Sequence, residues 1–156
     1  MSDLPRPAPA FTLPDDRLGD VTLSDLGPVV LFFYPRDNTS GCTKEAVGFT
    51  EALPALEALG VKVFGLSKDT LASHGRFRAK QGLEVGLLSD AEQQVCEAFG
   101  VWKEKKMYGK TFMGIERSTF LIDAGGQIVA EWRKVRIAGH VEEVVDTARR
   151  LIGGAA

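Results

Sequence analysis

The chain has 156 residues, of which 44% are hydrophobic and 26% are charged, a balance typical of one ordinary globular domain. We therefore expect a single domain over residues 1–156. A net charge of −2 argues against a nucleic-acid partner, because nucleic-acid-binding proteins usually carry a basic face. No run is long and apolar enough to cross a membrane, and the N-terminal segment lacks the apolar core of a signal peptide. These features predict a cytoplasmic protein that binds neither nucleic acid nor membrane.

Apolar residues along the chain predict alternating strands and helices. Short β-like pieces flank the turn-rich PDDRLG and predict a small hairpin, whereas continuous apolar runs predict strands buried on both faces. A tight AGG turn predicts a second hairpin near the C-terminus. The expected strands are 11–13, 20–23, 28–34, 61–67, 84–90, 117–123 and 127–133. Helices are expected after Cys42 and at 68–82, 89–100 and 138–154. The order predicts an α/β fold, a three-layer sandwich whose parallel central strands have antiparallel edges.

Several residues predict where individual elements begin, end or break. Pro54 is expected to interrupt or bend the helix after Cys42, or to begin a second segment. Asp69 or Thr70 is expected to cap the next helix, which Gly82 ends, and Asp90 is expected to cap the third helix.

The basic segment KEKKMYGK, residues 103–110, is predicted to be a solvated loop. The alternative is that it forms the rim of a partner or substrate site.

The segment YPRDNTSGCTKE places Cys42 where a buried strand ends and a helix begins. Ligands of open α/β sheets bind at this edge of the sheet. Asn38, Thr39 and Ser40 are all good N-cap residues, so the helix should begin close to Cys42. A helix N-terminus favours a thiolate over a thiol, which suits a nucleophile. The alternative is an inert cysteine that packs as a small hydrophobic residue.

Three other types of site are excluded by the same residues. The segment has no second glycine before a Gly-Lys-Ser/Thr triplet, so it is not a phosphate-binding loop. Glu45 occupies the place of the second cysteine in a Cys-x-x-Cys redox pair, which disfavours thiol–disulfide exchange. The two cysteines and two histidines have no metal-ligand spacing, so we expect no metal and no cofactor.

The string PRDNTSGCT resembles the active-site signature of the peroxiredoxins, Pro-x-x-x-Thr-x-x-Cys. The longer FYPRDNTSGCTKEAVGF is similar to the bacterioferritin-comigratory-protein branch, also called peroxiredoxin Q. Further similar pieces, APAFTLPD, LLSDAEQQVCEAFGVW and ERSTFLIDAGGQI, extend over nearly the whole chain. The resemblance implies a thioredoxin-like fold with a mixed central sheet. It also implies a peroxidase that reduces hydrogen peroxide and alkyl hydroperoxides.

The resemblance also implies a role for each residue of the signature. Cys42 would attack the peroxide and become a sulfenic acid. Thr39 would hold the reacting atoms in line, Pro35 would shield the pocket from water, and Arg117 would stabilise charge on sulfur and on the leaving oxygen. The simpler structural roles are an N-cap for Thr39, a strand end for Pro35 and, for Arg117, a surface ion pair with Glu116 or with a helix.

Two departures from the family pattern concern the resolving cysteine. Many relatives carry it at the position of Val47 and others at the position of Arg78, but neither is a cysteine here. We therefore expect a one-Cys mechanism with an external thiol reductant, thioredoxin or another thiol, and a monomer as in the family branch. The alternatives are a two-Cys mechanism with Cys96 as resolving residue, and a peroxide-sensing thiol protein whose oxidation a partner reads.

Overall fold

The computed structural model describes residues 3–153. Its main sheet has eight strands in the order β1-β10-β9-β4-β5-β6-β2-β3, and a separate two-stranded sheet is made of β7 and β8. The main-sheet strands are β1 (Arg6–Pro7), β2 (Thr12–Asp15), β3 (Gly19–Thr22), β4 (Val29–Phe33), β5 (Lys62–Ser67), β6 (Gly86–Ser89), β9 (Ser118–Ile122) and β10 (Gln127–Arg133). The second sheet comprises β7 (Trp102–Met107) and β8 (Lys110–Ile115). The helices are α1 (Ser40–Glu57), α2 (Leu71–Gln81), α3 (Gln94–Ala98) and α4 (His140–Leu151), with a 3₁₀ turn η1 (Leu23–Asp25).

The main sheet is mixed, as predicted. β4 pairs with β5, and β5 with β6, in parallel, whereas β9 pairs antiparallel with β4 and β10. Parallel pairing follows from the helical crossovers α1 and α2, which return the chain to the same edge. The carboxyl ends of β4, β5 and β6 therefore meet at one edge of the sheet, and helices begin there.

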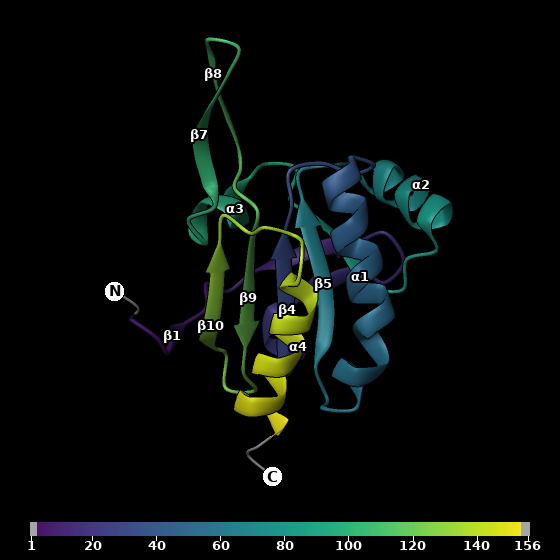
Figure 1. Ribbon diagram of the computed structural model, residues 1–156, viewed down its shortest axis with the longest axis vertical. Helices are drawn as coiled ribbons and strands as arrows, with labels where there is room; N and C mark the ends of the chain where they lie inside the picture. The colour runs from purple at the N-terminus through teal and green to yellow at the C-terminus, as the bar shows by residue number, and fades with distance from the viewer. Residues whose placement is uncertain (1–2, 154–156) are drawn as a thin grey trace.

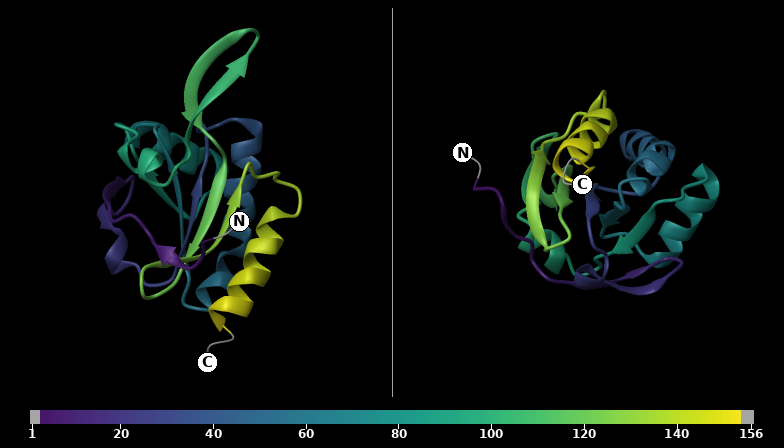
Figure 2. Two further views of the ribbon diagram at one scale, coloured as in Figure 1. Left: turned by 90° about the vertical axis from the view of Figure 1, so that its left-hand side faces the viewer. Right: turned by 90° about the horizontal axis from the view of Figure 1, so that it is seen from below.

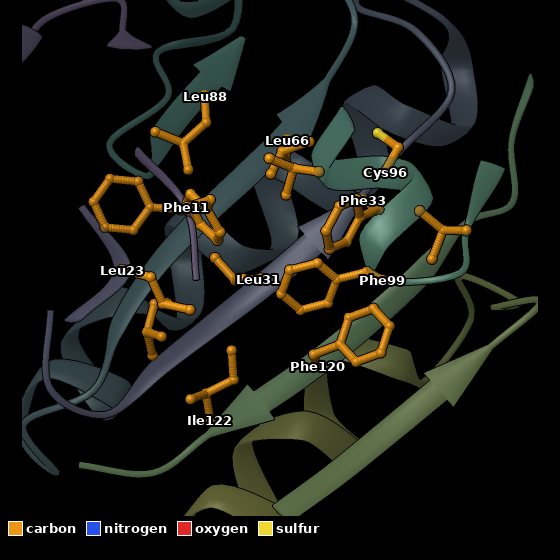
Figure 3. Packing of buried hydrophobic residues seen from close by; sticks show 14 of the residues in the cluster. Phe11, Leu23, Leu31, Phe33, Leu66, Leu88, Cys96, Phe99, Phe120 and Ile122 are labelled. Carbon is orange, nitrogen blue, oxygen red and sulfur yellow. The ribbon is translucent and has the colours of Figure 1, made fainter. Parts of the chain in front are cut away.

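Alternate side chains of β4 supply two separate hydrophobic clusters. Leu31 and Phe33 belong to one cluster and Phe32 and Tyr34 to the other, because successive residues of a strand point to opposite faces. Figures 1 and 2 show α1, α2 and α4 on one face and the N-terminal hairpin with α3 on the other. Figure 3 shows the packing of the α3-side cluster, including Phe33 and Cys96. The two clusters hold the layers of the predicted three-layer sandwich together.

The helix after Cys42 does not stop at Pro54. α1 runs without interruption from Ser40 to Glu57, so the predicted break or restart is wrong. Pro54 is exposed and lies in the last turn, where the lost N–H leaves a carbonyl that solvent can satisfy. Leu56, fully buried just beyond it, anchors the end of the helix against the sheet.

The predicted caps of the two shorter helices have different outcomes. Thr70 caps α2, since its hydroxyl accepts a hydrogen bond from the Ser73 N–H at 3.1 Å. Gly82 ends α2 in the left-handed conformation, with φ of 65°. Asp90 is not the N-cap residue of α3, which begins at Gln94, but its carboxylate still accepts the Cys96 N–H at 2.8 Å.

The basic segment 103–110 forms a β-hairpin, so the predicted solvated loop is wrong. β7 and β8 pair in register from Trp102–Ile115 to Met107–Lys110, and the hairpin projects from the body of the protein (Figure 1). Tyr108 and Gly109 form its turn with φ of 53° and 74°, the left-handed conformations that a two-residue hairpin turn requires. The strands lack alternating apolar residues, so the sequence pattern does not indicate them.

Among the described residues, no helix combines the length and the apolar character needed to span a membrane.

Candidate active site

Cys42 lies at the edge of the sheet where the parallel strands end. It is the third residue of α1, and its side chain is only 1% exposed. The N–H groups of a helix's first turn have no acceptor within the helix and carry its partial positive charge. Cys42 therefore combines burial with a backbone environment that stabilises negative charge.

Arg117 reaches this sulfur from the residue just before β9. Its Nη2 donates to Cys42 Sγ at 3.1 Å, and its Nη1 donates to Glu45 Oε1 at 2.7 Å. Burial alone would lower the pKa of Arg117, but the contacts with Glu45 and Cys42 raise it, so the guanidinium stays charged. The interaction of Arg117 with the sulfur, rather than a surface ion pair with Glu116, is what this structure contains.

Gly41 explains how the guanidinium approaches so closely. A Cβ atom at position 41 would lie 3.3 Å from Arg117 Nη2 and 3.3 Å from the Ile137 side chain. Such contacts are tighter than ordinary van der Waals separation, so a larger residue would push Arg117 away from Cys42. A side chain at position 41 would therefore force Arg117 or Ile137 to shift by a few tenths of an ångström.

Glu45 lies one turn further along α1 and is fully buried. Burial raises its pKa to about 7, although the Arg117 charge and hydrogen bond oppose that shift. Within the described part of the chain, its Oε2 has no hydrogen-bond partner, and His140 Nε2 lies 3.9 Å away. The Glu45 carboxyl therefore changes charge near neutral pH, in direct contact with the residue that binds Cys42 Sγ.

His140 completes the inner side of the site. Burial lowers its pKa to about 4, with a smaller contribution from the Arg117 cation. The ring is therefore neutral at neutral pH, and its Nε2 forms a 2.8 Å hydrogen bond with the Thr119 hydroxyl. A neutral ring next to Glu45 adds no second cation to the site.

Thr39 and Pro35 lie in the loop between β4 and α1. Thr39 is the N-cap residue of α1 by position, but its hydroxyl makes no cap and instead donates to the Arg36 carbonyl at 3.2 Å. It makes no hydrogen bond to Cys42 in this structure, and its side chain is exposed. Pro35 is also exposed and lines a groove next to the site.

A buried polar network fixes this loop to the rest of the fold. Asp37 accepts hydrogen bonds from the Tyr34 hydroxyl at 2.6 Å and the Ser73 hydroxyl at 2.8 Å, and contacts His74 Nδ1 at 2.7 Å. The other ring nitrogen of His74 lies 2.9 Å from the Leu88 carbonyl. Burial opposes a charge on His74, but the bonds to Asp37 outweigh it and raise its pKa. The network holds the loop that precedes Cys42 in one conformation.

The groove beside the site has a volume of 510 Å³ and lies at the base of the β7–β8 hairpin. Pro35 lines it from the loop, and Trp102, Lys105 and Phe112 line it from the hairpin. Burial and the Arg117 cation lower the pKa of Lys105, against the opposing attraction of Cys42. Lys105 therefore lies close enough to interact electrostatically with the site.

The second cysteine lies on the opposite face of the sheet. Cys96 is fully buried in the α3-side cluster, whereas Cys42 belongs to the cluster under α1. Burial raises the pKa of Cys96 far above its ordinary value, and the neighbouring Asp90 carboxylate raises it further. Of the positions where relatives carry a resolving cysteine, Val47 is half-buried, and Arg78 binds Asp16 through bonds of 2.6 and 2.8 Å.

Comparison with known proteins places this geometry in a family. The model of the AhpC/TSA family matches residues 4–131. The chain belongs to the AhpC/TSA family. Its similarity to the proteins below assigns it to the peroxiredoxins, in the bacterioferritin-comigratory-protein, or peroxiredoxin Q, branch. The predicted peroxiredoxin enzyme and thioredoxin-like fold are thereby confirmed.

Individual relatives are similar over most of their length. The putative peroxiredoxin Bcp of Coxiella burnetii is 50% identical over 140 residues, which cover 88% of this chain and 93% of that protein. Peroxiredoxin Bcp of Bacillus subtilis is 44% identical over 146 residues, covering 92% and 93%. The solved structure of the Xanthomonas campestris bacterioferritin comigratory protein, studied for its alkyl peroxide reduction activity, has a TM-score of 0.85 at 42% identity. It covers 90% of each chain.

Sequence reasoning set aside or missed three residues next to the cysteine. From the sequence, Glu45 is a candidate only for orienting Arg117 or for a reciprocal capping bond at the helix start, and Lys105 falls within the predicted loop. His140 was considered only as a metal ligand. Charged residues in a basic segment and a histidine at a helix start are common on protein surfaces, so the sequence alone contains no signal that Glu45 and His140 are buried or that half-buried Lys105 interacts with the site.

Proposed function

We propose that Cys42 is the peroxidatic residue of a thiol-dependent peroxidase. Its thiolate attacks one peroxide oxygen, an S–O bond forms, the O–O bond breaks, and the leaving oxygen takes a proton to become water or an alcohol. The observation that carries this proposal is the 3.1 Å bond from Arg117 Nη2 to Cys42 Sγ, at the N-terminus of α1. A charged donor at that distance stabilises negative charge on sulfur and on the departing oxygen.

The other signature residues act by positioning in this proposal. Thr39 directly precedes α1. Its hydroxyl turns from the Arg36 carbonyl to the peroxide when substrate binds. Pro35 covers the loop side of the pocket and excludes water. The backbone N–H of Cys42 offers a further donor, since first-turn N–H groups have no helical acceptor.

We propose hydrogen peroxide and alkyl hydroperoxides as substrates and an external thiol as reductant. The relative from Xanthomonas campestris, studied for alkyl peroxide reduction, supports the second substrate class. The external thiol attacks the sulfenic acid, water leaves, and a mixed disulfide forms; a second thiol then releases reduced Cys42. The burial and raised pKa of Cys96 support this one-Cys mechanism over resolution by Cys96. The cytoplasmic location, the single domain and the monomeric state stay predictions.

Reduction by a bulky thiol requires Cys42 to become accessible from its 1% exposed position. We propose that the first turn of α1 unfolds locally after oxidation, because secondary-structure elements open most easily at their less stable ends. Hydrogen exchange should then show weaker protection of the 42–48 amides in the oxidised protein. Equal protection in both forms would contradict this opening.

The decisive experiment is mass spectrometry after one equivalent of peroxide, followed by a turnover assay. A gain of about 16 Da on Cys42 identifies the sulfenic acid of one-Cys chemistry. A loss of about 2 Da with Cys42 linked to Cys96 identifies two-Cys chemistry instead. Cys42→Ser should abolish steady-state peroxide consumption with dithiothreitol, and retained consumption would overturn the proposal. Consumption that stops after one equivalent in the wild-type protein would indicate a sensor.

A further inference from the structure

The β7–β8 hairpin is an arm that leaves the body of the protein (Figures 1 and 2). Among the described residues, its two strands pair only with each other, so both of its edges are free. An isolated two-stranded hairpin is at best marginally stable in water, and free strand edges favour association. The catalytic residues proposed above all lie in the body of the protein, so the length of this arm has no role in the peroxide step.

The arm gathers exposed apolar side chains. Of the seven large hydrophobic residues that are exposed within residues 3–153, four lie on it: Met107 (57%), Tyr108 (96%), Phe112 (43%) and Met113 (49%). Exposed apolar residues that are scattered need no explanation, but a concentration on one element marks an interaction surface. Methionine and tyrosine are also the residues that adapt to and anchor protein partners.

The arm carries positive charge on an otherwise acidic protein. Residues 102–115 contain four lysines and one glutamate, a net charge of +3, so the rest of the chain carries −5 to give the total of −2. Lys103 and Lys105 share one face of the ribbon with Phe112, because residues paired across an antiparallel ladder point to the same side. That face carries no carboxylate, so a complementary partner is acidic with an apolar centre.

The base of the arm lies close to the site, because β8 ends two residues before Arg117, whose Nη2 binds Cys42 Sγ. The Lys105 side chain lies across Gly114, where an added Cβ would be 3.3 Å from its Cδ, and it interacts electrostatically with Cys42 and Arg117. The 510 Å³ groove lies between this base and Pro35. A protein bound along the arm would therefore be held next to the sulfur.

We propose that the β7–β8 hairpin is the docking arm for an acidic dithiol protein that reduces oxidised Cys42. The inference rests on the proposed function, since it concerns the partner that reduces the sulfenic acid. A second copy of the chain is not a suitable partner, because Cys42 and Cys96 are 1% and 0% exposed and offer it no accessible thiol. The lysines steer the acidic partner, and the apolar tip gives it a contact surface.

The test compares two sets of substitutions that leave the groove intact. The arm variant combines Tyr108→Ser with Lys110→Glu, both exposed at the tip, and Lys110 lies on the same face as Lys105 and Phe112. The control combines Leu18→Ser, at an exposed hydrophobic residue, with Lys62→Glu, at the opposite end of the parallel strands. Each protein is assayed with thioredoxin, thioredoxin reductase and NADPH, and separately with dithiothreitol.

We expect the arm variant to raise the KM for thioredoxin by about tenfold or more, as loss of a steering charge and an aromatic anchor does. The control should stay within about twofold, and the wild-type KM should rise with salt because charge steering is screened. The rate of the first oxidation and the turnover with dithiothreitol should be the same in all three proteins.

The outcomes separate this inference from the proposed function. Absence of turnover with dithiothreitol in the wild-type protein would overturn the proposed function itself. Normal turnover with dithiothreitol, together with an unchanged KM for thioredoxin in the arm variant, would overturn only the docking arm. The docking arm would also be overturned if neither thioredoxin nor glutaredoxin reduced the wild-type protein. A wild-type dimer in sedimentation that the arm variant converts to a monomer would also overturn it, by assigning the arm to self-association.

Discussion

Cys42 and Cys96 occupy similar positions in the fold, but the charged groups beside them have opposite signs. Each cysteine is the third residue of a helix, follows a parallel strand of the central sheet and is at most 1% exposed. Beside Cys42, the nearest charged group is the Arg117 guanidinium at 3.1 Å. Beside Cys96, it is the Asp90 carboxylate, which accepts the backbone N–H of the same residue at 2.8 Å.

A place at a helix start does not by itself determine the charge that faces a thiol. Burial disfavours the charged form of either cysteine. The Arg117 cation donates a hydrogen bond to the sulfur of Cys42, whereas the Asp90 carboxylate adds to the effect of burial and raises the pKa of Cys96. The sign of the neighbouring charge therefore distinguishes the environments of the two cysteines.

The largest effect should come from removing the cation beside Cys42. Arg117→Met keeps much of the side-chain volume but should slow the oxidation of Cys42 about 10²–10³-fold, as loss of a transition-state donor does. Stopped-flow measurement of the reaction with hydrogen peroxide gives this rate. Arg149→Met, at an exposed residue of α4, is the matched control and should leave the rate unchanged. A similar rate in both variants would mean that Arg117 does not distinguish the two cysteines.

A smaller effect is expected from displacing Arg117 without removing it. Gly41→Ala places a Cβ 3.3 Å from Nη2 and should slow oxidation about tenfold, because small misplacements of a catalytic group lower the rate. Gly75→Ala in α2 is the control, since its added Cβ would meet no neighbouring atom within 4 Å in the described part of the chain. If both substitutions left the oxidation rate intact, the close approach at Gly41 would have no catalytic importance.

The ionisation of Glu45 should change the oxidation rate of Cys42 a few-fold, in a pH-dependent way. Its pKa is raised to about 7, so wild-type Glu45 is neutral well below pH 7 and ionised above it. Glu45→Gln resembles the neutral form, and a charged hydrogen bond is roughly twice as strong as a neutral one. The two proteins should therefore react alike near pH 6, and wild type should be about fivefold faster near pH 8. His140, with a pKa of about 4, does not titrate in this range.

Rates measured across pH 6–8 would test this, with the exposed Glu51→Gln as control. A constant ratio between Glu45→Gln and wild type over that range would show that Glu45 does not titrate there.

The smallest effect should come from the second cysteine. Cys96→Ala should leave peroxide turnover with dithiothreitol within about twofold of wild type and cost about 1 kcal/mol of unfolding free energy, through the small cavity it creates. Urea denaturation and the turnover assay measure the two quantities. Loss of turnover with an intact first oxidation would assign Cys96 the resolving role and remove the contrast between the two cysteines.

Much of the architecture follows from local patterns along the chain. The strand around 28–34 is a continuous apolar run, and such a run folds as a buried strand in most contexts. The AGG turn marks the hairpin of the strands around 117–123 and 127–133. Thr70 and Gly82 delimit α2 for reasons that act within a few residues. The β7–β8 hairpin has no local signal because β7 is mostly charged, and Pro54 does not end α1 because tertiary packing anchors Leu56.

The sequence by itself determined the strand–helix order and the position of Cys42 at a helix start, because hydrophobic periodicity and capping act over short distances. Its resemblance to the peroxiredoxins also pointed to Arg117. Only the tertiary structure decided that Arg117 meets Cys42 from 75 residues away, through the pairing of β4 with β9. It also decided that Glu45 is buried, with one oxygen that finds no partner within residues 3–153, and that Lys105 interacts with the site. Burial and the charges that face a group depend on packing between distant segments, and no local pattern encodes them.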